Sequence, residues 1–338
     1  MSLGLFVLGT CVVPLGLRVA AGRLQPPDAR PSYLPAVETP RVRAPFDQSV
    51  VDTLRETRPD YYVIGDSMAG TRIQPGHLSR IIGGRGSASL LYAGVGSAYW
   101  YLTFKNVIVE PGLKPKGVIF FFRDQNMTDP LFRAYPGSMD RVARDQEPIL
   151  NEILAERSNG TFFRLHWAAQ ALYRYDVVRA WVEPQIPTVP VALAARRSNR
   201  KKLLERINGE VFTLDALRPT AAADMQAAPE SALDFDRTLP DSVLPEILRL
   251  SRETGIRVAF IRCQRRPVNH QPPVQSPSMQ RYVAHLRAYL RANLAYYHDD
   301  WGDPEQPLEI YEDGDHIARQ YIRYYTELFV RRNREFFR

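Results

Sequence analysis

Two short polar stretches near opposite ends of the chain carry residue types that suit nucleophilic catalysis. In the first, Ser67 follows Gly65 and Asp66 directly after the apolar run YYVI. In the second, DGDHI, Asp313 stands three residues before His316. Within one tight turn this spacing lets the carboxylate reach the imidazole and fix its tautomer, so the other ring nitrogen can accept a serine proton. The two stretches therefore predict a serine nucleophile with a base and a base-orienting acid.

Two further polar turns contain groups that can stabilise a developing negative charge. AGVGS (93–97) supplies glycine N–H groups, and FFFRDQN (120–126) ends in amide side chains. Ligands of parallel α/β sheets bind beyond the carboxyl ends of the strands, so turns that follow such strands meet at one edge. Backbone N–H groups and amides placed there can form an oxyanion hole. Together the four stretches indicate serine-dependent acyl transfer.

The segments between these turns must form the elements that bring them together. Continuous apolar runs such as 61–64 and 116–122 are typical of strands buried on both faces. Their alternation with helices predicts an α/β fold with a mostly parallel sheet. The predicted strands are 61–64, the start of 87–100, 116–122, 256–263 and 308–311, and the predicted helices are 47–56, 76–82, the end of 87–100, 239–255, 278–295 and 317–337.

The polar stretches also resemble those of a known family. GDSM (65–68), AGVGS (93–97) and DGDHI (313–317) resemble the first, second and last sequence blocks of the SGNH, or GDSL-like, hydrolase superfamily. They occur in the superfamily's order and span nearly all of the chain beyond its linker. The resemblance implies a flavodoxin-like three-layer α/β/α sandwich and acyl-ester chemistry that needs no cofactor.

The resemblance implies a role for each matching residue. It makes Ser67 the nucleophile, His316 the base and Asp313 the partner of the base. Asp66 would support the turn through hydrogen bonds rather than take part in the chemistry. The backbone N–H groups of Ser67 and of Gly96, or of the next residue by a shift of one position, would face the oxyanion.

The third block departs from the superfamily pattern. In that pattern a glycine and any residue precede an asparagine whose amide completes the oxyanion hole, but FFFRDQN has no glycine. Counting from the strand end favours Gln125 as the amide donor, while residue type favours Asn126. Arg123 is a further candidate, either to steady an oxyanion or to bind an anionic group of the substrate.

A hydrophobic amino-terminal segment and a helical insertion resemble features of bacterial envelope proteins that add or remove acetyl groups on polysaccharides. The expected function is therefore that of a serine esterase or O-acyltransferase, most simply an O-acetyltransferase. Its expected substrate is an acylated carbohydrate, such as an envelope glycan, or a small ester. Tyr99, Trp100 and Tyr101 lie near the predicted site, where they could stack on a sugar ring or pack in the core.

Two other interpretations stay open. A catalytically silent relative that keeps the fold for envelope assembly or glycan binding would explain the altered third block, but not the intact serine, aspartate and histidine. A metal-dependent hydrolase would take its ligands from one short region without an H-E-x-x-H or comparable frame. Its candidate ligands are Asp299, Asp300, Asp313, Asp315 and His316.

The composition is that of a globular protein, with 45% hydrophobic and 24% charged residues among 338. A formal net charge of +7 would suit nucleic-acid binding. However, arginines are scattered through the predicted helices, and no basic stripe with stacking aromatics occurs, which argues against a nucleic-acid partner. The two cysteines, Cys11 and Cys263, predict neither a zinc site nor a disulfide.

The amino-terminal segment (1–22) contains an uncharged apolar run, 3–17, about as long as a signal-peptide core. It predicts an export signal or a single membrane anchor, followed by a proline-rich linker (23–45). The body (46–338) is then one α/β domain with a helical insertion at about 140–232. We expect the body in the cell envelope, exported or membrane-anchored, although Arg18 and Arg23 taken alone would keep it cytoplasmic.

Overall fold

The computed structural model describes residues 43–158, 230–266 and 274–338, together with positions 12, 16, 19, 33 and 34. Most of the predicted export signal or anchor (1–22), of the linker (23–45) and of the insertion (about 140–232) lies outside the described residues. Among the helices of these ranges, none combines the length and the apolar character that crossing a bilayer needs. The chain divides into two compact units, Met1–Pro45 with Arg144–Thr220 and Phe46–Ala143 with Ala221–Arg338. All elements named below belong to the second unit.

The second unit is built on a sheet of five parallel strands: β1 (Tyr61–Gly65), β2 (Ser87–Leu91), β3 (Gly117–Phe122), β4 (Arg257–Arg262) and β5 (Tyr296–Asp299). Their order is β2-β1-β3-β4-β5, which is the flavodoxin-like order. The chain first steps from β1 to β2 and then returns to the other side of β1. Sheets of this kind bind ligands at the carboxyl end of such a reversal. The turns after β1 and β3 therefore border the expected ligand site.

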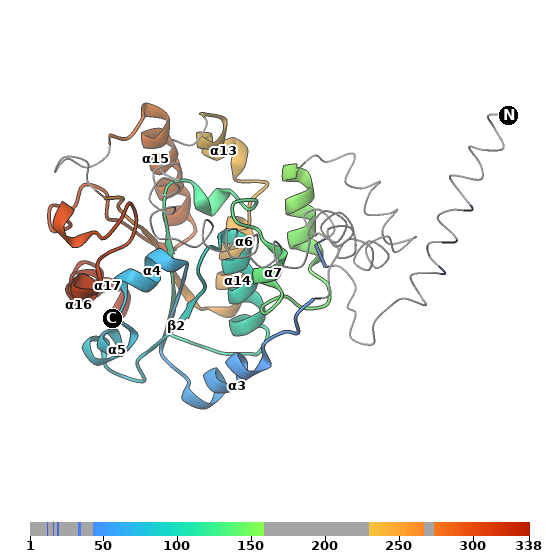
Figure 1. Ribbon diagram of the computed structural model, residues 1–338, viewed down its shortest axis with the longest axis horizontal. Helices are drawn as coiled ribbons and strands as arrows, with labels where there is room; N and C mark the ends of the chain where they lie inside the picture. The colour runs from blue at the N-terminus through green and yellow to red at the C-terminus, as the bar shows by residue number, and fades with distance from the viewer. Residues whose placement is uncertain are drawn as a thin grey trace, which may run out of the picture. The chain divides into compact units, whose positions relative to one another are not determined.

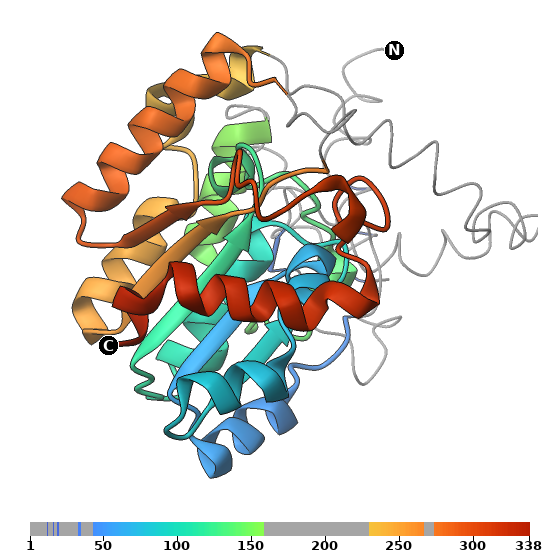
Figure 2. The same ribbon diagram turned by 90° about the vertical axis from the view of Figure 1, so that its left-hand side faces the viewer.

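Helices cover both faces of the sheet and complete a three-layer α/β/α sandwich, which confirms the predicted fold class (Figures 1 and 2). On one face, α16 (Ile322–Arg332) packs against α4 (Ser67–Arg72) and α5 (Pro75–Ile82). On the other, α14 (Leu244–Thr254) packs against α6 (Ser97–Leu102) and its π-helical continuation η2 (Thr103–Val109).

The described part of the second unit also contains further helices and turns. They are α3 (Gln48–Thr57), α7 (Pro136–Met139), α13 (Phe235–Thr238), α15 (Pro277–Ala292), α17 (Arg334–Phe337) and the 3-10 turns η3 (Asn126–Thr128), η4 (Glu230–Leu233), η5 (Leu308–Ile310) and η6 (Arg319–Tyr321). Of these, α15 packs against the edge strand β5, and α17 follows α16 directly.

Side chains alternate between the two faces of the strands, and both sets are apolar because both faces are covered. Toward α16, the ring of Phe121 lies 5.2 Å from that of Phe329. Toward η2, Phe120 stacks on Phe260 at 5.2 Å, and Phe104 meets Phe120 edge-on. The run GVIFFF of β3 is therefore buried throughout.

The predicted strand at 308–311 is wrong. Leu308–Ile310 forms the turn η5, and Tyr311 makes only an isolated antiparallel bridge to Ile317. The fifth strand is instead Tyr296–Asp299, whose four residues are all half-buried. It lies at the sheet edge, so its sequence YYHD lacks the apolar run that marks a doubly covered strand.

Two helices begin later than predicted. α14 begins at Leu244 rather than at 239, with a proline in its first turn, where proline is favoured. α16 begins at Ile322 rather than at 317, since the bridge to Tyr311 holds Ile317 in extended backbone. The other predicted strands and helices are confirmed to within a few residues.

Candidate active site

Ser67 is held at the carboxyl end of β1 by a tight strand-to-helix turn. Gly65 ends the strand, and a β-carbon there would lie 2.6 Å from that of Ala69, so the position accepts no side chain. Buried Asp66 is the N-cap of α4, and its Oδ1 accepts a 2.9 Å hydrogen bond from the N–H of Met68. Ser67 is therefore the first residue of the helix, and the side chain of Asp66 caps the turn that holds it.

The loop between η5 and η6 carries the histidine and is folded by its own aspartate. Oδ1 of Asp313 accepts hydrogen bonds from the N–H groups of Asp315 (3.0 Å) and His316 (2.9 Å). Its other oxygen, Oδ2, lies 2.7 Å from Nδ1 of His316. The same carboxylate thus shapes the loop and orients the imidazole, as the spacing of three residues predicts.

His316 contacts Ser67, which lies far from it in the sequence. Nε2 of His316 lies 2.9 Å from Oγ of Ser67. When the carboxylate of Asp313 accepts a hydrogen bond from Nδ1–H, the neutral ring must offer Nε2 as an acceptor for the serine hydroxyl. The structure therefore brings Ser67, His316 and Asp313 into one hydrogen-bonded chain at the carboxyl edge of the sheet.

Asp313 stays ionised under ordinary conditions. Partial burial acts to raise the pKa of its carboxyl group, but hydrogen bonds from the ring and the backbone N–H of His316 outweigh this and hold the pKa below its usual value. The side chains of Asp313 and His316 remain 43% and 31% exposed. A negative charge thus faces the side of the imidazole that must become positive when it takes a proton.

Gly96 lies in the turn after β2, the neighbour of β1. A β-carbon at this residue would lie 2.2 Å from the backbone oxygen of Phe132. Ser97 is buried, and its hydroxyl donates to the backbone oxygen of Asp129 at 3.3 Å. The absence of a side chain at Gly96 therefore lets the 129–132 segment approach this turn closely.

The turn after β3 distinguishes its two amides. Asn126 is 3% exposed, and its side-chain Nδ2 has no hydrogen-bond partner in the described structure. In Gln125 the unpaired atom is Oε1, which is an acceptor. A buried donor without an acceptor is unfavourable by about 1–3 kcal/mol, so such donors often await a ligand or an ion. Of the two candidates, Asn126 thus offers the donor that an oxyanion needs.

Arg123 is buried in the same turn and forms an ion pair with Asp315 of the histidine loop. Burial, followed by repulsion from Arg265, lowers its pKa. Arg265 in turn bonds Asp124 through Nε at 2.9 Å. The charge of Arg123 is thus matched inside the protein, and its role toward substrate stays a prediction.

Sequence reasoning did not single out Arg72, Thr71 or Arg133, all of which touch parts of this site. Nη1 of Arg72 donates to the backbone oxygen of Asp315 at 2.7 Å, and Oγ1 of Thr71 accepts from the N–H of Ile317 at 3.3 Å. Arg133 lies 3.6 Å from the carboxylate of Asp66. Each contact joins distant segments, so no local pattern indicates it.

The candidate metal ligands form hydrogen bonds and ion pairs with other side chains of the protein. Asp299 pairs with Arg262 at 3.1 Å, and Asp300 accepts from the hydroxyl of Tyr325. Across 43–158, 230–266 and 274–338, no group of three or more His, Cys, Asp or Glu side chains is arranged to hold a metal ion. The proposed set of five ligands is therefore not brought together.

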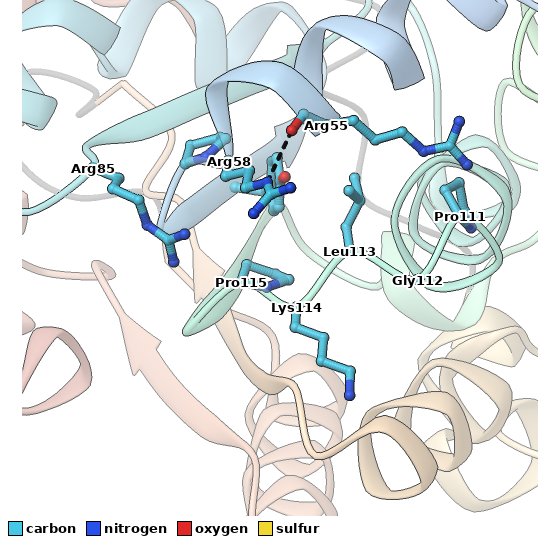
Figure 3. A pocket seen from close by; sticks show the side chains of 10 residues that line it. Arg55, Arg58, Arg85, Pro111, Gly112, Leu113, Lys114 and Pro115 are labelled. Carbon is cyan, nitrogen blue, oxygen red and sulfur yellow. Dashed lines mark hydrogen bonds between the residues drawn. The ribbon is translucent and has the colours of Figure 1, made fainter.

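A hollow of about 480 Å³ lies away from the triad, where β1 and β3 begin (Figure 3). Its lining contains no serine, cysteine, histidine or carboxylate. Figure 3 shows the side chains of Arg55, Arg85 and Lys114 around it, and Nε of Arg85 donates a hydrogen bond to Asp60 at 2.9 Å. The residues that line it are Arg55, Arg58, Pro59, Tyr62, Arg85, Pro111, Gly112, Leu113, Lys114 and Pro115.

Comparisons with known proteins found no matching family model and no matching curated protein. A search of solved structures found similar proteins, among them the following two. A protein assigned as an acylhydrolase in Bacteroides fragilis is 12% identical, with 86% of this chain and 97% of that one covered and a TM-score of 0.39. A GDSL-like lipase of Bacteroides thetaiotaomicron is 11% identical, with 85% and 95% covered and a TM-score of 0.38. At such low TM-scores neither structure says what this chain does.

Proposed function

We propose that this chain is a serine-dependent acyl-ester hydrolase of the SGNH type. The observation that carries the proposal is the order of three groups: Oγ of Ser67 lies 2.9 Å from Nε2 of His316, and Nδ1 of the same ring lies 2.7 Å from Asp313. A hydroxyl, a base and an ionised acid in this order are what nucleophilic acyl transfer requires.

In the first half of the reaction, Oγ of Ser67 attacks the ester carbonyl while Nε2 of His316 takes the hydroxyl proton. Ionised Asp313 stabilises the imidazolium. The backbone N–H groups of Ser67 and Gly96, with Nδ2 of Asn126, donate to the oxyanion of the tetrahedral intermediate. Collapse of the intermediate breaks the ester bond, and His316 gives its proton to the departing alcohol. The product is an acyl group on Ser67.

In the second half, an incoming hydroxyl attacks the acyl-serine while Nε2 of His316 takes its proton. His316 then returns that proton to Oγ of Ser67 as the acyl group leaves. Water as acceptor releases a carboxylic acid, and a sugar hydroxyl gives an O-acylated carbohydrate. Partial exposure of His316 and Asp313 supports access of water, so hydrolysis is the activity we propose first.

An acetylated envelope glycan is our proposed substrate class, and O-acetyl transfer to such a glycan is the alternative reaction. The aromatic residues near the site give no support to a glycan substrate. The exposed fractions of Tyr99, Trp100 and Tyr101 are 7%, 0% and 0%, so their rings cannot stack on a sugar. Export or anchoring through residues 1–22 remains part of the proposal. Fractionation of cells that produce the chain with and without residues 1–22 would test it.

The direct test is labelling of the full chain with a fluorophosphonate, beside Ser67→Ala, followed by mass spectrometry of the adduct. We expect an adduct on Ser67 and none in the variant, together with hydrolysis of p-nitrophenyl acetate. A folded wild-type chain that neither labels nor turns over would contradict the enzyme proposal. That result would instead favour a silent relative that keeps the fold for binding.

A further inference from the structure

Arg72, the last residue of α4, is a wholly buried arginine, with an exposed fraction of 0%. Its guanidinium donates to three backbone oxygens from three parts of the chain. Nη1 bonds Met68 at 3.3 Å and Asp315 at 2.7 Å, and Nη2 bonds Gln264 at 2.8 Å. One side chain thus joins the nucleophile helix, the histidine loop and the segment that follows β4.

The environment of Arg72 suits a guanidinium, whose two terminal nitrogens are hydrogen-bonded while its Nε has no partner in the described structure. Its group lies 5.6 Å from the ring centroid of Tyr325 and 6.0 Å from that of Tyr311. A planar fork of fixed N–H donors can bond several carbonyl oxygens at once, whereas an ammonium group is a single point on a flexible stem. Charge burial is unfavourable unless such bonds are made. The carbonyl oxygens and aromatic rings at this position therefore match the shape and charge of an arginine side chain.

The oxygens that Arg72 holds are next to the reacting groups. Met68 directly follows Ser67, and Asp315 directly precedes His316. On the other side of the histidine, the N–H of Ile317 donates to Thr71, the residue before Arg72. The helix that begins with the nucleophile therefore holds the backbone on both sides of the base.

We propose that Arg72 is a positioning residue that keeps His316 at hydrogen-bonding distance from Ser67. The inference rests on the proposed function of that pair. Catalytic groups must stay within about 0.5 Å of their productive geometry, and a shift of about 1 Å can lower a rate by about a hundredfold. Arg72 acts through the backbone and touches no substrate.

The chain offers a matched control. Arg262 of β4 is also buried, with an exposed fraction of 1%; it bonds Asp299 at 3.1 Å and lies over the ring of Trp301 at 5.0 Å. None of these partners belongs to the triad. Arg72→Lys and Arg262→Lys therefore make the same chemical change at two buried arginines, one with and one without a link to the base.

The kinetic test compares both variants of the full chain on p-nitrophenyl acetate, well below their unfolding temperatures. We expect Arg72→Lys to lower kcat by about ten- to a hundredfold, with KM changed less than about twofold, because the ammonium cannot hold all three oxygens. Arg262→Lys should lower the unfolding temperature but leave kcat within about threefold of wild type. An equal loss of kcat in both variants would overturn the proposal.

A second measurement needs no turnover. The ¹⁵N resonance of Nε2 in His316 reports the hydrogen bond from Ser67, and Ser67→Ala defines its value without that bond. We expect the resonance in Arg72→Lys to move toward that value, and in Arg262→Lys to stay at the wild-type value. A wild-type resonance in Arg72→Lys would refute the positioning role. Absence of wild-type turnover would refute only the proposed function, because the resonance still tests the geometry.

Discussion

Ser67, His316 and Asp313 form a single chain of hydrogen bonds, so their effects on turnover should not add. We expect Ser67→Ala and His316→Ala each to remove nearly all hydrolysis, and the double variant to be no slower than either single one. Asp313→Asn should lower kcat by up to about 10⁴-fold, since an amide favours the wrong tautomer. Steady-state kinetics on one ester would check this. Additive losses would show that the residues do not act together.

Asp313 also makes stability depend on pH. Its folded-state pKa lies below the usual value of an aspartate, so the group contributes stability that is present above the unfolded pKa and is lost as pH falls through the folded pKa. The difference in unfolding temperature between wild type and Asp313→Asn should be constant above about pH 5 and shrink below about pH 4. Thermal unfolding from neutral to acid pH measures it. A difference that persists unchanged below the folded pKa would contradict the assignment.

The two amides after β3 should differ in their effect on the reaction. Asn126 carries the unpaired buried donor, so Asn126→Ala should lower kcat by about a hundredfold or more. Gln125→Ala is the matched control and should stay within a few-fold of wild type. The rate of fluorophosphonate labelling checks both. The reverse order would assign the oxyanion donor to Gln125.

At the scale of elements, the turn from β2 to α6 tolerates only glycine at one point. A β-carbon on Gly96 would overlap the oxygen of Phe132, so Gly96→Ala should destabilise the fold by about 1–3 kcal/mol and slow turnover. Gly76, in α5 with nothing within 4 Å, is the control. Gly76→Ala should leave turnover unchanged and stabilise by up to about 1 kcal/mol. Denaturant unfolding measures both, and equal effects would contradict this account.

The predictability of each element follows from its burial. β1 and β3 are covered on both faces and appear in the sequence as unbroken apolar runs. β5 lies at the edge, half-buried, and its residues YYHD carry no such signal. In the candidate site, too, some contacts could be predicted from the sequence and others could not. The Asp313–His316 contact is local and could be predicted from spacing, whereas the contacts of Arg72 and Arg123 join distant segments and have no signature in sequence.

At the scale of the whole unit, the end of the sheet where β1 and β3 begin contributes to stability, whereas the triad lies at the opposite, carboxyl edge. Phe336 of α17 is 1% exposed and packs on Gly117, where β3 begins, and on Tyr61, where β1 begins. Phe336→Ala should therefore destabilise the fold by about 3–5 kcal/mol. Its kcat, measured at a temperature where the variant is fully folded, should match wild type, because the triad lies at the opposite edge. A fall in kcat without unfolding would show that the two ends are coupled.

The hydrogen bond between Ser67 and His316 joins residues 249 positions apart. Parallel sheets with such remote partners fold slowly, since long stretches of chain must be ordered before distant contacts form. During synthesis the nucleophile leaves the ribosome long before its base exists. An incomplete chain lacks the proposed base, so we expect its Ser67 to stay unreactive toward a fluorophosphonate. The time at which Ser67 becomes reactive toward a probe would therefore report when the carboxyl-terminal part of the chain has folded.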